Sequence, residues 1–129
     1  MRARYPDCDG IVVRDGTGIR YERYGRGRPA IMLLPTWSLV HSRHWKMQVA
    51  YLARHFTVVC FDGRGSGGSG RPPEPAAYTD VQFASDAIAV ARCTGGTLVT
   101  LAGSGHFPHA RDPVRVNLLI KQFADGFRR

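Results

Sequence analysis

Short apolar runs separated by glycine-rich breaks make up the first part of the chain. Residues 11–13 and 19–24 flank a Gly-rich stretch at 14–18, which predicts two antiparallel strands joined by a turn. After a second break at 25–29, residues 30–34 form a continuous apolar run, as in a strand that is buried on both faces. We therefore expect three strands in this part of the chain.

The spacing of apolar residues becomes helical after Ser42. An amphipathic helix of about three turns is predicted by the apolar residues Trp45, Val49, Leu52, Ala53 and Phe56. Residues 57–61 form a second continuous apolar run and predict a buried strand. This strand leads directly into residues 62–70, which contain too many Gly and Ser residues for regular structure.

A capping-box signature opens the next predicted helix, with Thr79 at the N-cap and Gln82 three residues later. The apolar stripe of this helix consists of Val81, Ala84, Ile88 and Ala91. Gly95 and Gly96 end the helix, and residues 97–101 predict a third buried strand.

The last predicted element is a helix that follows a glycine turn at 103–105. Asp112 is expected to be its N-cap, because Pro113 then occupies the first helical position. Its apolar stripe consists of Val116, Leu119, Ile120 and Phe123.

The predicted order is β-β-β-α-β-α-β-α, without an internal repeat or a domain boundary. Buried strands that alternate with amphipathic helices indicate an α/β fold with a mostly parallel sheet covered on both faces. In such sheets, ligands bind beyond the carboxyl ends of the strands. The candidate site loops are therefore residues 35–41, 62–70 and 102–112.

Composition narrows the class of protein. A length of 129 residues suits one compact domain, and a charged fraction of 22% argues against disorder. No stretch is long and apolar enough to predict a membrane span, and the N-terminus has no apolar segment typical of a secretory signal. Three cysteines at wide spacing, Cys8, Cys60 and Cys93, favour a reduced, cytoplasmic protein without a disulfide framework.

The net charge of +8 comes almost wholly from arginines that are spread along the whole chain. Because basic residues neither cluster nor alternate with aromatic residues, a nucleic-acid partner is not expected. Two histidine pairs at i, i+3 spacing, at 41/44 and 106/109, raise zinc or nickel binding as an alternative. We expect no metal site and no cofactor, since Pro108 interrupts one pair and the other opens a helix.

The Gly-rich segment after the strand at 57–61 resembles a known turn. Residues 61–69 match the D-x-R-G-x-G-x-S turn that α/β-hydrolases carry after their fourth strand. Its glycines permit positive φ angles, and Asp62 and Arg64 are expected to bond the backbone of the turn.

Two further loops resemble the same family. Residues 34–38 lie where the family carries its oxyanion loop, with Pro35 and Thr36 in place of the usual His-Gly. The resemblance implies that the backbone N–H of Trp37 is an oxyanion donor, the alternative being that Trp37 only covers the sheet end. Residues 103–108 look like the family's G-x-G-H-x-P segment, which implies that His106 is a catalytic base rather than a surface histidine.

The resemblance covers the chain in two pieces. Residues 9–92 look like the N-terminal half of an α/β-hydrolase, and 95–127 look like its C-terminal end. The nucleophile strand, the G-x-S-x-G elbow, the cap and the strand with the triad acid have no counterpart between them. Right-handed crossover geometry would place the strand at 97–101 in the position of the missing nucleophile strand.

This placement suggests Ser104 as a surrogate nucleophile, since its turn would occupy the position of the elbow. His106 is then the expected base, with His41 or His44 as alternatives. Either Asp62 or Asp112 would orient the base.

The sequence thus predicts one truncated domain over residues 1–129, an abbreviated α/β-hydrolase-like three-layer sandwich. About five strands, the first pair antiparallel and the rest parallel, are expected with three helices. The expected function is that of a small esterase-like hydrolase acting on a small-molecule ester or acyl substrate. A catalytically inactive binding or interaction module is the alternative, and a designed or selected minimal protein is a third. The exposed sheet edge favours a homodimer, and no membrane partner is expected.

Overall fold

The structure is a computed structural model, and it describes residues 4–35, 41–95 and 112–126. The chain divides into two compact units, Met1–Thr97 and Leu98–Arg129. Each unit is described by itself below.

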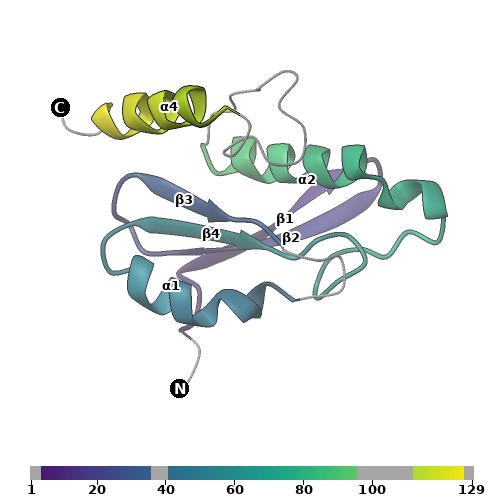
Figure 1. Cartoon of the computed structure of the whole chain (residues 1–129). Helices are drawn as coiled ribbons and strands as arrows, with labels where there is room; N and C mark the ends of the chain where they lie inside the picture. Colours follow the sequence, from purple (N-terminus) through teal and green to yellow (C-terminus); the bar gives the residue numbers. More distant parts are fainter. Residues whose placement is uncertain (1–3, 36–40, 96–111, 127–129) are drawn as a thin grey trace. The chain divides into compact units, whose positions relative to one another are not determined.

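A four-stranded mixed sheet forms the centre of the first unit (Figure 1). Its strands are β1 (Cys8–Arg14), β2 (Thr17–Tyr24), β3 (Ala30–Leu33) and β4 (Thr57–Phe61), in the order β1-β2-β4-β3. The β1–β2 and β2–β4 pairs are antiparallel, whereas β3 and β4 are parallel. The four predicted strands in this part of the chain are confirmed. The predicted strand at 97–101 lies outside the described residues.

Alternating side chains of β4 contribute to two different cores. Val58 and Cys60 pack with Val49 and Ala53 on one face, and Val59 and Phe61 pack with Val90 and Ile19 on the other. In Figure 1, α1 (Lys46–Leu52) covers the first face and α2 (Asp80–Cys93) the second. The apolar run at 57–61 is therefore the centre of a three-layer α/β sandwich, as expected.

The helix predicted after Ser42 is shorter than its apolar pattern indicates. It opens with a 3-10 turn, η1 (Ser42–Trp45), and α1 ends at Leu52 rather than continuing to Phe56. The chain beyond α1 packs against the β2–β3 connection, where a Cβ on Gly27 would lie 1.8 Å from the His55 carbonyl oxygen. Tertiary packing thus ends this helix, because residues 53–56 must turn to bring β4 beside β3.

Both predicted helix caps are confirmed. Thr79 accepts a hydrogen bond from the Gln82 backbone N–H at 3.4 Å at the start of α2, which follows the 3-10 turn η2 (Pro75–Tyr78). In the second unit, the Asp112 side chain accepts from the Arg115 N–H at 3.2 Å at the start of α4 (Pro113–Asp125). None of the helices in the described part of the chain is long and apolar enough to cross a membrane.

Candidate active site and its supporting turn

The carboxylate of Asp62 connects the Gly-rich turn after β4 to the start of η1. Asp62 directly follows β4 and is buried. Its Oδ2 accepts a hydrogen bond from the Gly68 N–H at 2.9 Å, and its Oδ1 accepts from the Ser42 N–H at 2.8 Å. One side chain therefore fixes the Gly-rich turn and the start of η1 at the same edge of the sheet.

The carboxyl group of Asp62 favours its ionised form although it is buried. Removal from water alone would raise the pKa of this carboxyl group. The N–H groups of Gly68 and Ser42 outweigh that effect, so the pKa of Asp62 lies below its usual value. The group is consequently ionised at neutral pH and serves as a fixed acceptor.

The glycine that faces this carboxylate has a conformational and a steric reason to be glycine. Gly67 has a φ of +50°, and a Cβ at this position would lie 2.2 Å from Oδ2 of Asp62. The prediction that Asp62 bonds the backbone of a positive-φ turn is confirmed.

The serine that ends the turn motif is a structural residue. Ser69 is buried, its Oγ donates to the Asp62 carbonyl oxygen at 2.6 Å, and the same Oγ accepts from the Arg20 N–H at 2.9 Å. The Gly70 N–H also donates to the Gly18 carbonyl oxygen at 2.8 Å. These bonds attach the turn to β2, so its position relative to the sheet is fixed from two sides.

Arg64 does not act as predicted. It points to α2, where its Nε and Nη2 donate to the Asp86 carboxylate at 2.7 and 2.8 Å, and its Nη1 donates to the Ala77 carbonyl oxygen at 2.7 Å. Arg14 from the end of β1 donates to the same carboxylate at 2.7 Å. This buried network joins β1, the turn and α2.

Asp86 was not predicted from the sequence as a functional or structural residue. Its position on the buried face could have been inferred from its spacing, because Gln82, Asp86 and Val90 recur every four residues on α2 and share the face turned toward the sheet. The Gln82 side-chain oxygen accepts from Arg14, as does the Gln82 carbonyl oxygen at 3.1 Å. Gln82 thus supports the network with its side chain.

Two histidines lie at the start of the helical segment after β3, His41 as the N-cap of η1 and His44 within it, and their hydrogen bonds define different tautomers. His41 Nδ1 accepts from the Arg43 N–H at 3.0 Å and lies 3.6 Å from Oδ1 of Asp62. Since Nδ1 is an acceptor, the proton of the neutral His41 ring is on Nε2. The ring is therefore not oriented by Asp62 in the manner of a triad histidine.

His44 has the opposite arrangement. Its Nδ1 lies 2.8 Å from the His41 carbonyl oxygen, and because a carbonyl only accepts, Nδ1 carries the proton. Nε2 then has the free lone pair, and this buried atom has no hydrogen-bond partner in the described part of the chain. Of the two alternative bases, His44 has the tautomer that general-base chemistry requires.

Of the other predicted site residues, only Asp112 is described by the structure. Trp37, Ser104 and His106 lie outside the described residues. Asp112 caps α4 in the second unit, whereas Asp62 belongs to the first. Their catalytic roles stay predictions. Within the described ranges, no three His, Cys, Asp or Glu side chains are grouped in a way that would hold a metal ion.

A family model matches the part of the chain that contains both the Asp62 turn and two strands of the sheet. The sequence model described as "alpha/beta hydrolase fold" matches residues 29–110, which include β3, α1, β4, the Asp62 turn and α2. The chain belongs to the α/β-hydrolase family. The resemblance and the abbreviated α/β sandwich predicted from the sequence are confirmed. None of the curated proteins matches the chain.

Solved structures with this fold include several hydrolases. Est816, described as an N-acyl homoserine lactone degrading enzyme, is 31% identical with a TM-score of 0.57, over 67% of this chain and 32% of that one. The enol-lactonase from Burkholderia xenovorans LB400 is 29% identical with a TM-score of 0.59, over 67% of this chain and 33% of that one. Epoxide hydrolase A from Mycobacterium thermoresistibile is 26% identical with a TM-score of 0.59, over 69% and 28% of the respective chains. This α/β-hydrolase chain spans about a third of the length of the two lactone-cleaving proteins.

Proposed function

We propose that this α/β-hydrolase chain hydrolyses carboxylic ester bonds in small molecules, including the cyclic esters of lactones. The observation that carries the proposal is the double attachment of Asp62, to Gly68 and to Ser42. It holds the Gly-rich turn that follows β4 to the start of η1, and ligands of this class of sheet bind beyond the carboxyl ends of the strands. The similarity to two proteins named as lactone-degrading enzymes supports the choice of substrate class.

The proposed chemistry is acyl transfer through Ser104. Its Oγ attacks the ester carbonyl carbon while His106 takes the hydroxyl proton, and the oxyanion accepts from the Trp37 N–H. Collapse breaks the C–O bond, and the proton moves from His106 to the leaving alcohol. Water then attacks the acyl-serine in the same way and releases the acid. Asp62 or Asp112 would orient the base.

His44 is a second candidate for the base, and its tautomer favours it. The Nε2 lone pair is buried and without a partner among the described residues, while Nδ1–H is held by the His41 carbonyl oxygen. Replacing His44 by Asn keeps a donor near the Nδ1 position and removes Nε2. Equal activity of this variant and the parent would leave His106 as the base, and a loss of about a hundredfold would assign the role to His44.

A serine-reactive fluorophosphonate with intact-mass readout tests the proposal directly. We expect one adduct on the parent chain, none on Ser104→Ala, and one on the control Ser85→Ala, whose serine is partly exposed on α2 and donates to the Val81 carbonyl oxygen. Hydrolysis of p-nitrophenyl acetate should fall about a thousandfold or more in Ser104→Ala. A folded parent chain without an adduct and without turnover would contradict the proposal and favour the inactive binding module.

We also propose that the chain forms a homodimer through its sheet edge in the cytoplasm. Among the described strands, β1 and β3 are the outer members of the sheet, and strands at an edge carry backbone groups able to pair with another chain. Light scattering at high micromolar concentration should give twice the monomer mass. A monomer mass would contradict this pairing.

A further inference from the structure

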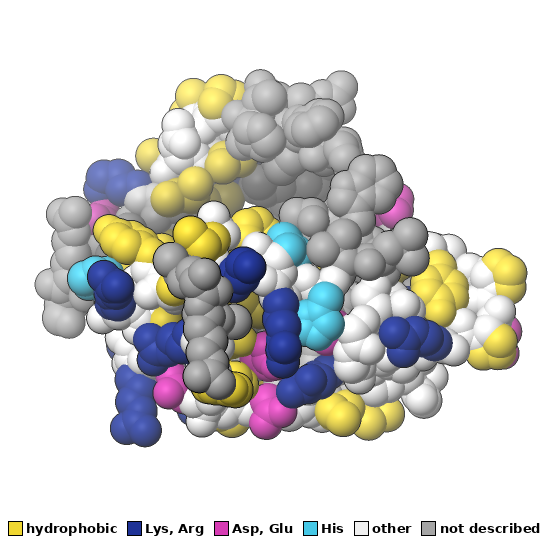
Figure 2. Space-filling view, turned by 90° about the horizontal axis from the view of Figure 1, so that it is seen from below, with side chains coloured by type: hydrophobic (Ala, Val, Ile, Leu, Met, Phe, Trp, Pro, Cys, Tyr) yellow, Lys and Arg dark blue, Asp and Glu magenta, His cyan; other side chains and the backbone are white. Residues whose placement is uncertain are grey.

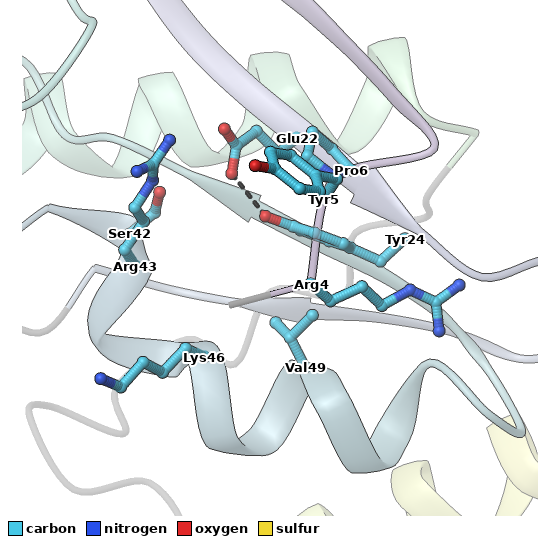
Figure 3. Close-up of a pocket in the computed structure, with 9 residues that line it drawn as sticks. All are labelled: Arg4, Tyr5, Pro6, Glu22, Tyr24, Ser42, Arg43, Lys46 and Val49. Atoms are coloured by element: carbon cyan, nitrogen blue, oxygen red, sulfur yellow. Dashed lines mark hydrogen bonds between the residues drawn. The ribbon is translucent and has the colours of Figure 1, made fainter. Parts of the chain in front are cut away.

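The first unit contains a cavity of about 220 Å³ between the N-terminal segment, β2 and the η1–α1 region, lined by both apolar and charged side chains (Figure 3). Its lining includes Glu22 and Tyr24 from β2, Arg43 and Lys46 from the helical side, and Arg4 and Tyr5 from the N-terminal segment. None of these six lining residues has a role in the acyl transfer proposed above. The cavity therefore raises a separate question of function.

A buried carboxylate and a buried phenol line the inner side of the cavity. Glu22 and Tyr24 are two positions apart on β2, so their side chains lie on the same face, and they are only 4% and 6% exposed. The Tyr24 hydroxyl donates to Oε2 of Glu22 at 2.5 Å. Burial, followed by this bond to the carboxylate, raises the pKa of Tyr24, so the phenol keeps its proton at neutral pH.

The Glu22 carboxylate has unused acceptor capacity. Arg20 Nη2 lies 3.3 Å from Oε1 but donates its hydrogen bond to Asp9 at 2.9 Å, and Tyr24 occupies one position on Oε2. A carboxylate has about four acceptor positions, so others remain for a ligand. A guanidinium already lies beside Oε1, and a hydroxyl group of a ligand can donate to the positions that remain.

The outer side of the cavity is cationic. Arg43 and Lys46 are three positions apart at the start of the helical segment, and neither side chain has a salt-bridge partner in the described part of the chain. Arg4 contributes a third cation, which pairs with Asp7 at 3.2 Å. Figure 2 looks onto this α1-covered side of the molecule and shows Lys and Arg side chains around a few acidic ones. The cationic groups would attract and hold an anion.

We propose that this cavity binds a small organic anion that also carries a hydroxyl group, such as a hydroxycarboxylate or a hydroxyalkyl phosphate. The anionic group contacts Arg43 and Lys46, and the hydroxyl group donates to Glu22. Ammonium-bearing ligands are disfavoured because the cations of the outer side repel them. The proposal does not depend on hydrolase activity, since none of these residues belongs to the proposed acyl-transfer group.

Titration of the full-length 15N-labelled chain at low ionic strength tests the site. L-malate and glycerol 3-phosphate represent the two sources of the anion, succinate is the matched anion without a hydroxyl group, and glycerol has hydroxyl groups without charge. We expect saturable shifts of the Arg43 and Lys46 amide signals with the first two ligands. Succinate should bind about fivefold more weakly, and glycerol should leave the signals unchanged.

Variants separate the two halves of the site. Arg43→Gln should weaken binding of malate about tenfold, whereas the control Arg54→Gln, an exposed arginine outside the cavity, should leave binding unchanged. Glu22→Met, which removes both carboxylate oxygens, should bring the affinities for malate and succinate together. Lys46→Gln is a further surface variant that tests the anion contact if the Glu22 variant does not fold.

The proposal would be overturned by any of three results with folded protein. These are equal affinity of the parent and Arg43→Gln for malate, equal affinity of the parent for malate and succinate, and no saturable shift up to about 20 mM ligand. Loss of esterase activity in Ser104→Ala with unchanged malate binding would support two independent sites.

Discussion

The Asp86 carboxylate accepts two parallel hydrogen bonds from the Arg64 guanidinium, at 2.7 and 2.8 Å. Both side chains are almost completely removed from solvent, at 1% and 3% exposure. The pair connects the turn after β4 to α2, and Arg14 extends it to β1. Each charge is stabilised by the other, because a buried ion without a partner would lose its hydration and gain no compensating hydrogen bonds.

Removal of Asp86 is therefore expected to be severe. Asp86→Ala should lower the free energy of unfolding by about 3–5 kcal/mol, since it leaves the buried Arg64 guanidinium and that of Arg14 without their shared partner. Urea unfolding followed by circular dichroism measures the change. The matched control is Asp15→Asn, because Asp15 also pairs with Arg14, at 2.9 Å, but is exposed, and Asn tolerates its positive φ of 49°. Its effect should stay below about 1 kcal/mol, and similar losses in the two variants would contradict the special role of the buried pair.

The lowered pKa of Asp62 predicts a pH dependence of stability. The folded-state pKa lies below the ordinary value of 3.8, so the contribution of this carboxylate is fully present above that value and is lost as pH falls through the folded pKa. Urea unfolding at pH values from about 6 to about 3 should show a difference in the free energy of unfolding between the parent and Asp62→Asn that is constant down to about pH 4.5 and narrows below it. A difference that is constant over this whole range would contradict the assignment.

Substitution of Gly67, which faces the Asp62 carboxylate, is a second test of the turn. Gly67→Ala combines a positive φ with a Cβ placed 2.2 Å from the Asp62 carboxylate, whereas Gly16→Ala has a positive φ of +74° and open space around it. The Gly16 variant should lose about 1–2 kcal/mol through backbone strain alone. The Gly67 variant should lose at least about 1 kcal/mol more. Thermal and urea unfolding of both variants provide the comparison, and equal losses would mean that the turn adapts without cost.

The three thiols should differ in reactivity. Cys60 is buried in β4, and burial, followed by the nearby Glu22 and Asp62 carboxylates, raises the pKa of its thiol to about 12. Cys8 and Cys93 are exposed. Under native conditions, iodoacetamide should modify Cys8 and Cys93 and leave Cys60 intact, with modification of all three in urea. Peptide mass spectrometry distinguishes the sites, and native labelling of Cys60 would indicate that the core opens readily.

The sequence pattern was sufficient to predict the elements that are stabilised by residues close to one another in the sequence. The run at 57–61 coincides with β4, and the caps at Thr79 and Asp112 form where their side chains predict them. A cap depends on bonds within four residues, and a buried strand is recognisable from its own composition. The position of the Asp62 turn was predictable for the same reason.

Features that depend on distant residues were not predictable in this way. Arg14 and Asp86 are 72 positions apart, and nothing in the sequence around either one indicates the other. The end of α1 at Leu52 is set by the close approach of Gly27 to His55, across a contact that the helical pattern does not contain. In the candidate site, sequence reasoning found Asp62 but assigned Arg64 to the wrong partner, because a guanidinium is long enough to reach another element.

Because β4 packs on both faces, the number of residues in this strand matters as much as their type. Val58 and Cys60 face one core and Val59 and Phe61 the other, and Asp62, the next residue, is held by backbone groups of two separate loops. An inserted residue within β4 would exchange the two sets of side chains between the cores or pull the carboxylate from its partners. Asp62 thus fixes the register of the central strand.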